Sequence, residues 1–283
     1  MATGILVLAS KRVGLELVRY LLDSEAPVER VIAATPADAA LVALATRRGV
    51  AAEGYTPATQ ATLIQERRRY AWLLNLWSPH RLRGEFLSLF DHRLNVHPGL
   101  VPLCRGNDNA AWTIRKRLPA GVALLEMREQ IDAGEVYVQR PVPYTFPTRG
   151  QDLHHRLQEE AIRLFRDAWP AIYAGTLVPK PQCGEGHYHT RRQTERDRVL
   201  PATAVMSLED FVLWILAHDF SPRTTAEMRY RGRTYRLTLT VTEGGTAPET
   251  DDAVRSLHAE SALREEGNDD MEDPVSGPAG RRP

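Results

Sequence analysis

The part of the sequence that decides the fold is the segment Asn95-Val96-His97-Pro98-Gly99-Leu100-Val101-Pro102. The run Arg93-Leu94 leads into it, which predicts a strand whose C-terminal end carries Asn95 and His97. Side chains alternate along a strand, so these two polar side chains should lie on the same side. Pro98-Gly99 then ends the strand and exposes its end, which is where open parallel sheets bind their ligands.

Strands and helices alternate on both sides of this segment. Short apolar runs without a helical period predict strands at 4–9, 28–34, 70–76, 121–127 and 135–142. Apolar residues at helical spacing predict helices at 12–23, 38–48, 59–69, 82–90, 107–117 and 151–174. Asn107 or Asp108 is expected to cap the fifth of these helices. The βαβα order predicts an α/β, Rossmann-like fold with a mostly parallel sheet and helices on both faces.

The composition along the chain predicts three segments. Residues 1–178 are expected to form the main domain, which the long helix at 151–174 closes. Residues 179–242 are expected to form a small α+β appendage, with a helix at 207–217 capped by Ser207 and a hairpin around Arg231-Gly232-Arg233. Residues 243–283 are rich in Gly, Pro, Ser and acidic residues, which predicts a disordered acidic tail with at most a helical turn at 254–263.

The overall composition is that of an ordinary globular protein, with 43% hydrophobic residues, 25% charged residues and zero formal net charge. Zero net charge argues against nucleic-acid binding over the whole surface, and no apolar run reaches membrane-spanning length. Cys104 and Cys183 match no disulfide framework, and the N-terminal apolar run is too short for a signal peptide. We therefore expect a reduced, cytoplasmic protein that binds neither nucleic acid nor a membrane.

Further along the chain, Ile131-Asp132-Ala133-Gly134 adds a carboxylate to the amide of Asn95 and the imidazole of His97. The amide can hold an oxygen that becomes negative, and the imidazole can move protons near neutral pH. The carboxylate can orient the imidazole or an attacking amine. Taken singly, each residue also fits a strand-end turn, with His97 bonded to a backbone oxygen. Their combination with the flanking Pro and Gly residues indicates a catalytic site.

A wider pattern surrounds these three residues. It comprises Asn95-x-His97-Pro98-x-Leu100-x-Pro102, Arg105-Gly106, Gly121-Val122, Met127, Asp132-x-Gly134 and Gln139. The pattern resembles the signature of the folate-dependent formyltransferases, and the resemblance covers about residues 1–240. Departures from the pattern are Gly99, where many members have Ser, Ala123, where many have Thr, and Leu125, where the glycinamide ribonucleotide enzymes have His.

Within that family the chain is most similar to the nucleotide-sugar amine N-formyltransferases. The residues that carry this likeness are Asn109, Trp112, Gly186-His187-Tyr188-His189 and Arg191-Arg192. The favoured function is therefore transfer of a formyl group from N10-formyltetrahydrofolate to the amino group of a nucleoside-diphosphate-linked aminodeoxysugar.

The resemblance implies the formyltransferase fold and assigns catalytic roles without a metal. Asn95 would donate to the oxyanion, His97 would transfer a proton, and Asp132 would orient His97 and the amine. N10-formyltetrahydrofolate would contact the segment after the strand at 70–76 and the loop at 127–132. The expected folate-binding residues are Trp77, Ser78, Pro79, His80, Leu82, Met127 and Gln130. An ordinary surface turn is the alternative for the first of these segments.

Two further segments are expected to hold the acceptor. Ser10-Lys11-Arg12 precedes the first helix, where backbone amides and two cations suit a phosphate; a solvated helical turn is the alternative. Arg105, Asn107, Asn109 and Trp112 follow the catalytic strand and offer groups for hydroxyls, a diphosphate and a base or sugar face. For Trp112 a place in the core is an equal alternative. The chain has no GxGxxG dinucleotide fingerprint.

Other functions stay open at this point. One is formylation of an amino acid, peptide or siderophore amine, and another is a non-catalytic folate- or partner-binding descendant of the fold. Methionyl-tRNA is disfavoured as the acceptor, because that subfamily carries a full C-terminal RNA-binding barrel and residues 180–242 are too few for one. Cys183, His187 and His189 lack the paired spacing of a structural zinc site, so no metal is expected. A homodimer is left open.

Overall fold

The structure is a computed structural model that describes residues 3–245. Met1–Leu239 form one compact unit and Thr240–Pro283 a second. The division of the first unit at residue 178, inferred from composition, stays a prediction. Most of the predicted acidic tail, including the helical turn at 254–263, lies outside the described residues.

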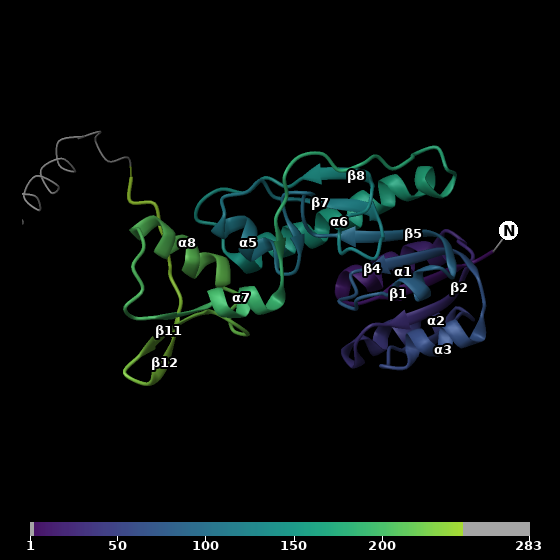
Figure 1. Cartoon of the computed structure of the whole chain (residues 1–283), viewed down its shortest axis with the longest axis horizontal. Coiled ribbons are helices and arrows are strands. Elements are labelled where there is room, and N and C mark those ends of the chain that lie inside the picture. Colours follow the sequence, from purple (N-terminus) through teal and green to yellow (C-terminus); the bar gives the residue numbers. More distant parts are fainter. Residues whose placement is uncertain (1–2, 246–283) are drawn as a thin grey trace, which may run out of the picture. The chain divides into compact units, whose positions relative to one another are not determined.

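The centre of the first unit is a seven-stranded sheet in the order β3-β2-β1-β4-β5-β7-β8 (Figure 1). Its strands are β1 (Ile5–Ala9), β2 (Val28–Ala33), β3 (Ala51–Gly54), β4 (Tyr70–Leu76), β5 (Phe90–His97), β7 (Gly121–Glu126) and β8 (Val136–Pro141). β1 to β5 pair in parallel, whereas β7 pairs antiparallel with both β5 and β8. The mostly parallel α/β sheet predicted from the sequence is confirmed.

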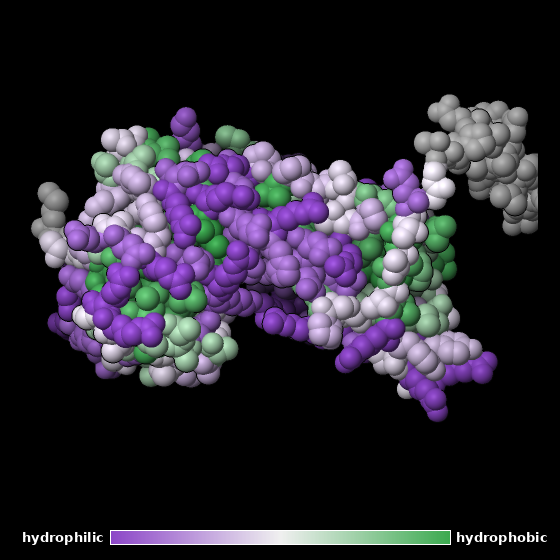
Figure 2. Space-filling view, turned by 180° about the vertical axis from the view of Figure 1, so that it is seen from behind, coloured by the Kyte–Doolittle hydropathy of each residue, from purple (hydrophilic) through white to green (hydrophobic). Residues whose placement is uncertain are grey.

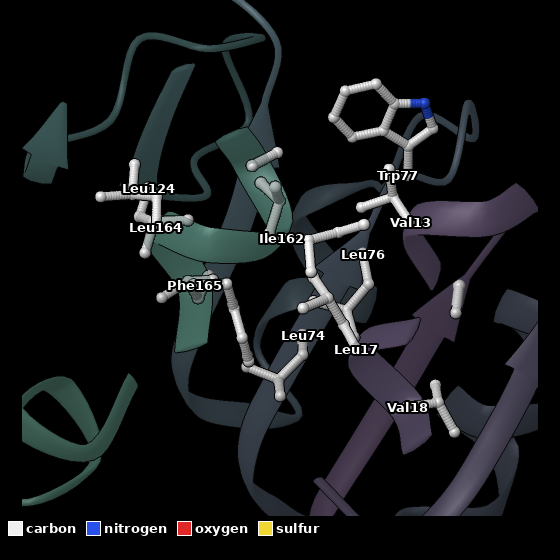
Figure 3. Close-up of a cluster of buried hydrophobic side chains, with 14 of the residues drawn as sticks. Val13, Leu17, Val18, Leu74, Leu76, Trp77, Leu124, Ile162, Leu164 and Phe165 are labelled. Atoms are coloured by element: carbon white, nitrogen blue, oxygen red, sulfur yellow. The ribbon is translucent and has the colours of Figure 1, made fainter. Parts of the chain in front are cut away.

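Helices cover both faces of this sheet. They are α1 (Lys11–Asp23), α2 (Ala39–Arg47), α3 (Thr59–Glu66), α4 (Gly84–Leu87), α5 (Asn109–Arg115) and α6 (Gly150–Tyr173). Alternate residues of β1 separate the two cores: Ile5 and Val7 pack with α1 and α6, and Leu6 and Leu8 pack with α3 and α4. The first core is the larger, and Figure 3 shows Leu17, Leu74 and Phe165 within it. Successive side chains of β1 thus pack into the cores on the two opposite faces of the sheet.

The remainder of the unit is a small α+β element. It contains β9 (Tyr188–His189), α7 (Arg191–Asp197), β10 (Val199–Pro201), α8 (Leu208–His218), β11 (Ala226–Tyr230) and β12 (Arg233–Leu237). Ser207 caps α8 through a bond from the Asp210 amide, and β11 and β12 form the hairpin, as predicted. β9 pairs in parallel with β6 (Arg105–Gly106), which follows β5. The small element is therefore tied to the loop after β5 by backbone hydrogen bonds.

Three local expectations were wrong. The helix predicted at 82–90 shrinks to α4, because Phe90 already pairs with Tyr70 and starts β5. Asp108 is the residue before α5, but it has a left-handed backbone with φ 57° and its side chain makes no capping bond. β3 and α7 have no counterpart in the predicted elements. Within residues 3–245 no helix is long and apolar enough to cross a bilayer.

The surface is largely polar. On the face shown in Figure 2, hydrophilic side chains predominate and hydrophobic ones form smaller separate areas. The most exposed large apolar side chains include Val205 and Leu208, both in the small C-terminal element. The question of a homodimer stays open.

Candidate active site

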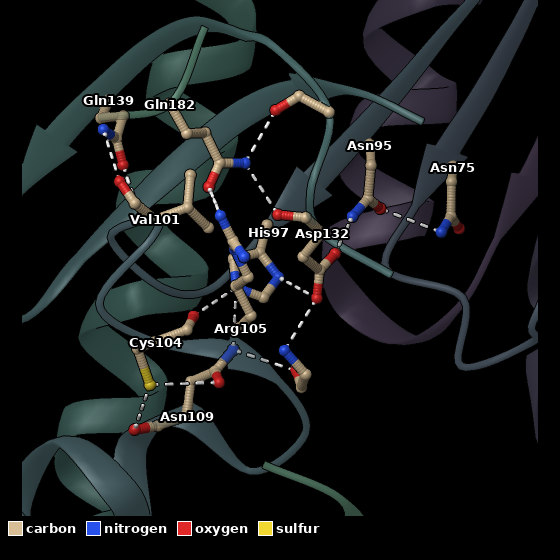
Figure 4. Close-up of polar contacts among 12 residues, drawn as sticks. Asn75, Asn95, His97, Val101, Cys104, Arg105, Asn109, Asp132, Gln139 and Gln182 are labelled. Atoms are coloured by element: carbon tan, nitrogen blue, oxygen red, sulfur yellow. Dashed lines mark hydrogen bonds and ion pairs between the residues drawn. The ribbon is translucent and has the colours of Figure 1, made fainter. Parts of the chain in front are cut away.

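Asn95 and His97 lie at the C-terminal end of β5, as the sequence predicts. Both side chains point to the same side of the strand and meet Asp132 (Figure 4). The Asn95 Nδ2 donates to Asp132 Oδ1 at 3.1 Å, and His97 Nδ1 lies 3.4 Å from Asp132 Oδ2. An amide, an imidazole and a carboxylate therefore converge on one point.

The loop after β5 fits closely around His97. A Cβ on Gly99 would lie 2.5 Å from the Cys104 carbonyl oxygen and 2.8 Å from His97 Nε2. Gln139 on β8 binds both backbone groups of Val101: its Oε1 accepts from Val101 N at 2.7 Å, and its Nε2 donates to Val101 O at 3.1 Å. A side chain at position 99 would not fit while the loop follows this path, and the bonds from Gln139 hold the loop against the sheet.

The ring of His97 has a defined proton position. Its Nε2 lies 2.8 Å from the carbonyl oxygen of Cys104, which can only accept, so Nε2 carries hydrogen. Asn109 Nδ2 is 3.3 Å from the same nitrogen and donates instead to the Gly106 carbonyl, also at 3.3 Å. Nδ1 of His97 is consequently the nitrogen that faces Asp132 and is available for proton transfer.

The Asp132 carboxylate is held by groups from two segments. Its Oδ2 accepts from the Gly106 amide at 2.8 Å, while its Oδ1 accepts from Asn95. Its backbone has φ 52°, in the left-handed region, which is uncommon for a residue other than glycine. The side chain is 8% exposed, so the carboxylate is nearly buried beside an equally buried imidazole. Such a carboxylate can orient an incoming amine, and it can accept from His97 once Nδ1 has taken up a proton.

A second amide connects this group to β4. Asn75 Nδ2 donates to Asn95 Oδ1 at 2.9 Å, and Asn75 Oδ1 accepts from the Ser78 amide at 3.1 Å. The Asn95 side chain therefore has its oxygen fixed by Asn75 and one hydrogen fixed by Asp132. Its second Nδ2 hydrogen is available to a developing oxyanion.

The three residues line one cavity of about 620 Å³. Of the expected folate-binding residues, Trp77, Ser78, Pro79, His80, Leu82 and Met127 line it. Gln130 is exposed and does not. His80 is fixed by Ala34, whose carbonyl lies 2.7 Å from its Nε2, and by stacking on Tyr55. The wall formed after β4 is thus held by specific contacts.

Of the expected acceptor-binding residues, Lys11, Asn107 and Asn109 line the same cavity. Ser10 is fully buried, and its hydroxyl donates to Asp38 Oδ2 at 2.8 Å. Arg12 lies 3.7 Å from Glu159, and both side chains are exposed. Neither Ser10 nor Arg12 is among the residues that line the cavity.

Arg105 and Trp112 also have partners away from the cavity lining. Arg105 donates twice to Gln182 Oε1, from Nε at 3.0 Å and from Nη2 at 2.6 Å. Trp112 donates to Thr194 at 2.9 Å and stacks on His189 with 4.0 Å between ring centroids. Its ring is buried, which agrees with the core alternative considered for it.

Several cavity residues were not anticipated as binding residues. They are Gln151, His154 and His155 at the start of α6, Arg191 at the start of α7, and Phe220, Ser221, Pro222 and Arg223 after α8. Burial, and then the charges of Lys11 and His155, lower the pKa of His154 to about 4. His154 is therefore neutral at physiological pH. The adjacent histidines and the pair Arg191-Arg192 were the available signals in the sequence, and nothing periodic marks the segment after α8.

The described residues contain no group of three or more His, Cys, Asp and Glu side chains arranged to hold a metal ion. Of the two thiols, Cys183 is exposed, and Cys104 is buried beneath the catalytic loop. Burial raises the pKa of Cys104 to about 11, so its thiol stays protonated and is a poor nucleophile.

Comparisons with known proteins complement this geometry. No family model matches the chain. The methionyl-tRNA formyltransferase of Geobacillus sp. (strain WCH70) is 28% identical over 153 residues, which are 50% of this chain and 48% of that protein. A protein of the same name from Streptococcus pneumoniae (strain Hungary19A-6) is 32% identical over 102 residues, 36% of this chain and 33% of that protein. The chain thus spans half or less of the length of these curated relatives.

Solved structures match over more of the chain. A sugar N-formyltransferase from Shewanella sp. superposes with a TM-score of 0.73 and 19% identity, covering 86% of this chain and 99% of that one. The chain has the formyltransferase fold. A 4-N formyltransferase from Francisella tularensis gives a TM-score of 0.73 at 17% identity, covering 85% of this chain and 98% of that one.

A third structure of this formyltransferase fold contains ligands. It is an N-formyltransferase from Helicobacter canadensis in complex with folinic acid and dTDP-3-aminofucose. It matches with a TM-score of 0.62 and 15% identity and covers 76% of this chain and 80% of that one. The matches in sequence and in structure together support the resemblance to the formyltransferases that the motif around Asn95 and His97 indicated.

Proposed function

We propose that this chain transfers a formyl group from N10-formyltetrahydrofolate to a primary amine, and that the acceptor is a nucleoside-diphosphate-linked aminodeoxysugar. The observation that carries the proposal is the convergence of Asn95, His97 and Asp132 in one cavity at the end of a parallel strand. The three groups combine an oxyanion donor, a proton carrier and an orienting carboxylate.

The part of the cavity lining contributed by β4, the segment up to α4 and β7 suits a folate ring system. Leu82, Leu87, Leu125 and Met127 are apolar lining residues, and Asn75 is a polar one. A flat heteroaromatic ring with polar edges suits apolar walls with a few fixed polar groups. When bound there, N10-formyltetrahydrofolate supplies an electrophilic formyl carbon.

The chain's own groups account for the transfer. The neutral amine attacks the formyl carbon, and the bond from that carbon to N10 breaks in the second step. The free Nδ2 hydrogen of Asn95 would stabilise the negative oxygen between these steps. His97 Nδ1, with Asp132 beside it, would accept the proton that the amine loses and would return that proton to N10 as the bond from the formyl carbon to N10 breaks. Near-complete burial of His97 and Asp132 strengthens these electrostatic contacts.

Other residues of the cavity lining support a negatively charged acceptor. Lys11, Arg191 and Arg223 come from three separate parts of the chain and line the cavity together with Asn107 and Asn109. Two phosphate groups suit such a set of cations, and the amides suit sugar hydroxyls. The structural similarity to sugar N-formyltransferases points the same way.

Methionyl-tRNA is the second candidate acceptor, because the curated sequence relatives carry that name. Those matches cover only 48% and 33% of the relatives, so they do not reach across the whole of those enzymes. The sheet of the small element after α6 here is a hairpin with one short parallel strand, and the formal net charge of the chain is zero. A zero net charge gives little electrostatic attraction for tRNA.

The proposal is tested by measuring consumption of N10-formyltetrahydrofolate with a panel of amines. The panel contains nucleoside-diphosphate aminosugars, free amino acids, hydroxamate precursors and methionyl-tRNA. Turnover of the aminosugars is expected. Turnover confined to amino acids or methionyl-tRNA would reject the sugar acceptor and retain formyl transfer. Folate binding without turnover of any amine would move the chain to the non-catalytic alternative.

A further inference from the structure

Gln182 occupies the junction of three segments beside the candidate active site. It lies in the chain after α6, half-buried, and its side-chain amide is fully engaged (Figure 4). Nε2 donates to the backbone carbonyls of Asp132 at 2.8 Å and Gly134 at 2.7 Å. Oε1 accepts both bonds from Arg105. One amide therefore binds the loop that carries Asp132 on one side and a cation on the other.

The Gln182 backbone is itself anchored to the sheet. Two residues earlier, Lys180 exchanges backbone bonds with Val136 at the start of β8, with lengths of 2.9 and 2.8 Å. Arg105 is anchored too, since its amide donates to the His187 carbonyl at 2.9 Å. Backbone hydrogen bonds thus hold the chain near Gln182 and at Arg105. The Gln182 side chain joins these two segments to the loop that carries Asp132.

The loop needs such support because of its geometry. Asp132 has a left-handed backbone, and a Cβ on Gly134 would lie 1.8 Å from the Glu126 carbonyl oxygen, so the turn is tight on both sides. The bond from Gln182 to the Asp132 carbonyl restrains the peptide unit next to the catalytic carboxylate. The positive charge of Arg105 polarises the amide and strengthens its donor end.

We propose that Gln182 is a positioning residue that fixes the Asp132 carboxylate toward His97 and Asn95, and that Arg105 acts through it. Arg105 then serves the catalytic loop, in place of the contact with the acceptor that the sequence suggested. The kinetic part of this inference rests on the proposed formyl transfer.

The informative substitution is Gln182→Glu, which keeps the size and the acceptor for Arg105 and removes the donor. A carboxylate oxygen then faces two carbonyl oxygens, which repels the Asp132 loop. The expected result is a fall in kcat of at least roughly tenfold, with KM for folate and for the amine changed less than about threefold, as for a group that acts in the transition state. Gln193→Glu is the control, because Gln193 caps α7 as an acceptor at an exposed site and gains the same charge.

Arg105→Met supplies a second variant, which leaves the two donor bonds of Gln182 in place. It should lower kcat less than Gln182→Glu does. On a logarithmic scale, the loss of kcat in the double variant should be smaller than the sum of the two single losses, since the two residues act through the same contacts. A kcat for Gln182→Glu within about twofold of the wild type, or an equal fall in the Gln193→Glu control, would overturn the inference.

Amide hydrogen exchange tests the same contact without any turnover. The Gly106 amide donates to Asp132 Oδ2, so its exchange reports the position of the carboxylate. Exchange at Gly106 and at residues 131–134 should be faster in Gln182→Glu and unchanged in Gln193→Glu. Unchanged exchange in Gln182→Glu would overturn the positioning role. A wild-type protein that forms no formyl product would instead reject the proposed function and leave this result standing.

Discussion

The imidazole of His97 turns its Nε2 toward the backbone carbonyl of Cys104, at 2.8 Å. This contact places the ring hydrogen on Nε2 and leaves Nδ1 facing the carboxylate of Asp132. The Cys104 side chain has no part in it, so the tautomer depends on the path of the backbone. Gly99 and Gln139 determine that path, which connects the residues of the motif to the tautomer of its histidine.

His97→Gln should lower kcat by roughly 100-fold or more, the scale of a lost acid–base group. The Gln Nε2 can still donate to the Cys104 carbonyl, so the loop keeps its shape while the proton-accepting nitrogen is lost. Steady-state kinetics and a thermal melt of the same preparation measure the two effects. Near-normal turnover would show that Nδ1 of His97 carries no proton in the reaction.

Asp132→Asn should also reduce kcat by roughly 100-fold, with little change in fold. One carboxylate oxygen becomes an NH₂ group, which must then face either the Gly106 amide or the Asn95 amide, both of which are donors. Asn95→Ala should cost a comparable factor through the lost oxyanion donor. If either variant kept more than about a third of wild-type kcat, its residue would not have the catalytic role proposed above.

Lys11→Ala and Arg223→Ala should each raise KM for an anionic acceptor by roughly tenfold, the worth of one charged hydrogen bond. Folate affinity should not change. Arg12→Ala is the matched control, because Arg12 neighbours Lys11 and pairs with Glu159 away from the cavity lining. Titrations at two salt concentrations would separate the contacts, since exposed charge interactions weaken with ionic strength. KM values equal to that of the wild type in all three variants would argue for an uncharged acceptor.

His154 should make the protein less stable in mild acid. Its pKa is about 4 in the folded chain and about 6.5 when unperturbed, so the folded state binds this proton less readily than the unfolded state. Above pH 6.5 the side chain is neutral in both the folded and the unfolded state, so its titration does not change the free energy of unfolding. As the pH drops from 6.5 through 4, the unfolded state takes up the proton first and the free energy of unfolding falls. The total loss is at most roughly 3 kcal/mol from a shift of this size.

Thermal melts of His154→Gln and wild type between pH 7 and pH 4 measure this loss. The melting temperature of the variant should fall less over that range than the melting temperature of the wild type. His155→Gln is the comparison, because His155 is the exposed neighbour on the same helix and only the last-named cause of the lowered pKa of His154; it should change the pH dependence less than His154→Gln does. Parallel pH curves for wild type and His154→Gln would show that the buried ring is not the source of the acid sensitivity.

The fold and the shared direction of the Asn95 and His97 side chains were predictable because they depend on local periodicity. Alternation along β5 puts Asn95 and His97 on one side, and the βαβ order gives the parallel sheet. Gln182 and the segment around Arg223 were not predictable in this way. Gln182 meets Asp132 from 50 positions away through a loop without periodicity. Charge alone also did not reveal that Arg12 and Arg105 have partners within the chain, because an arginine in a sequence gives no sign of whether its partner is a ligand or the chain itself.

The proposed formyl transfer is tested most directly by following one labelled formyl carbon. Wild-type protein is mixed with N10-formyltetrahydrofolate labelled at that carbon and with a nucleoside-diphosphate aminosugar, and the products are analysed by mass spectrometry and NMR. The expected result is a formamide on the sugar nitrogen in a one-to-one ratio with tetrahydrofolate, and none with Asp132→Asn at the same time point. Label that stays on folate or appears as free formate, with the aminosugar unmodified, would contradict the proposed function.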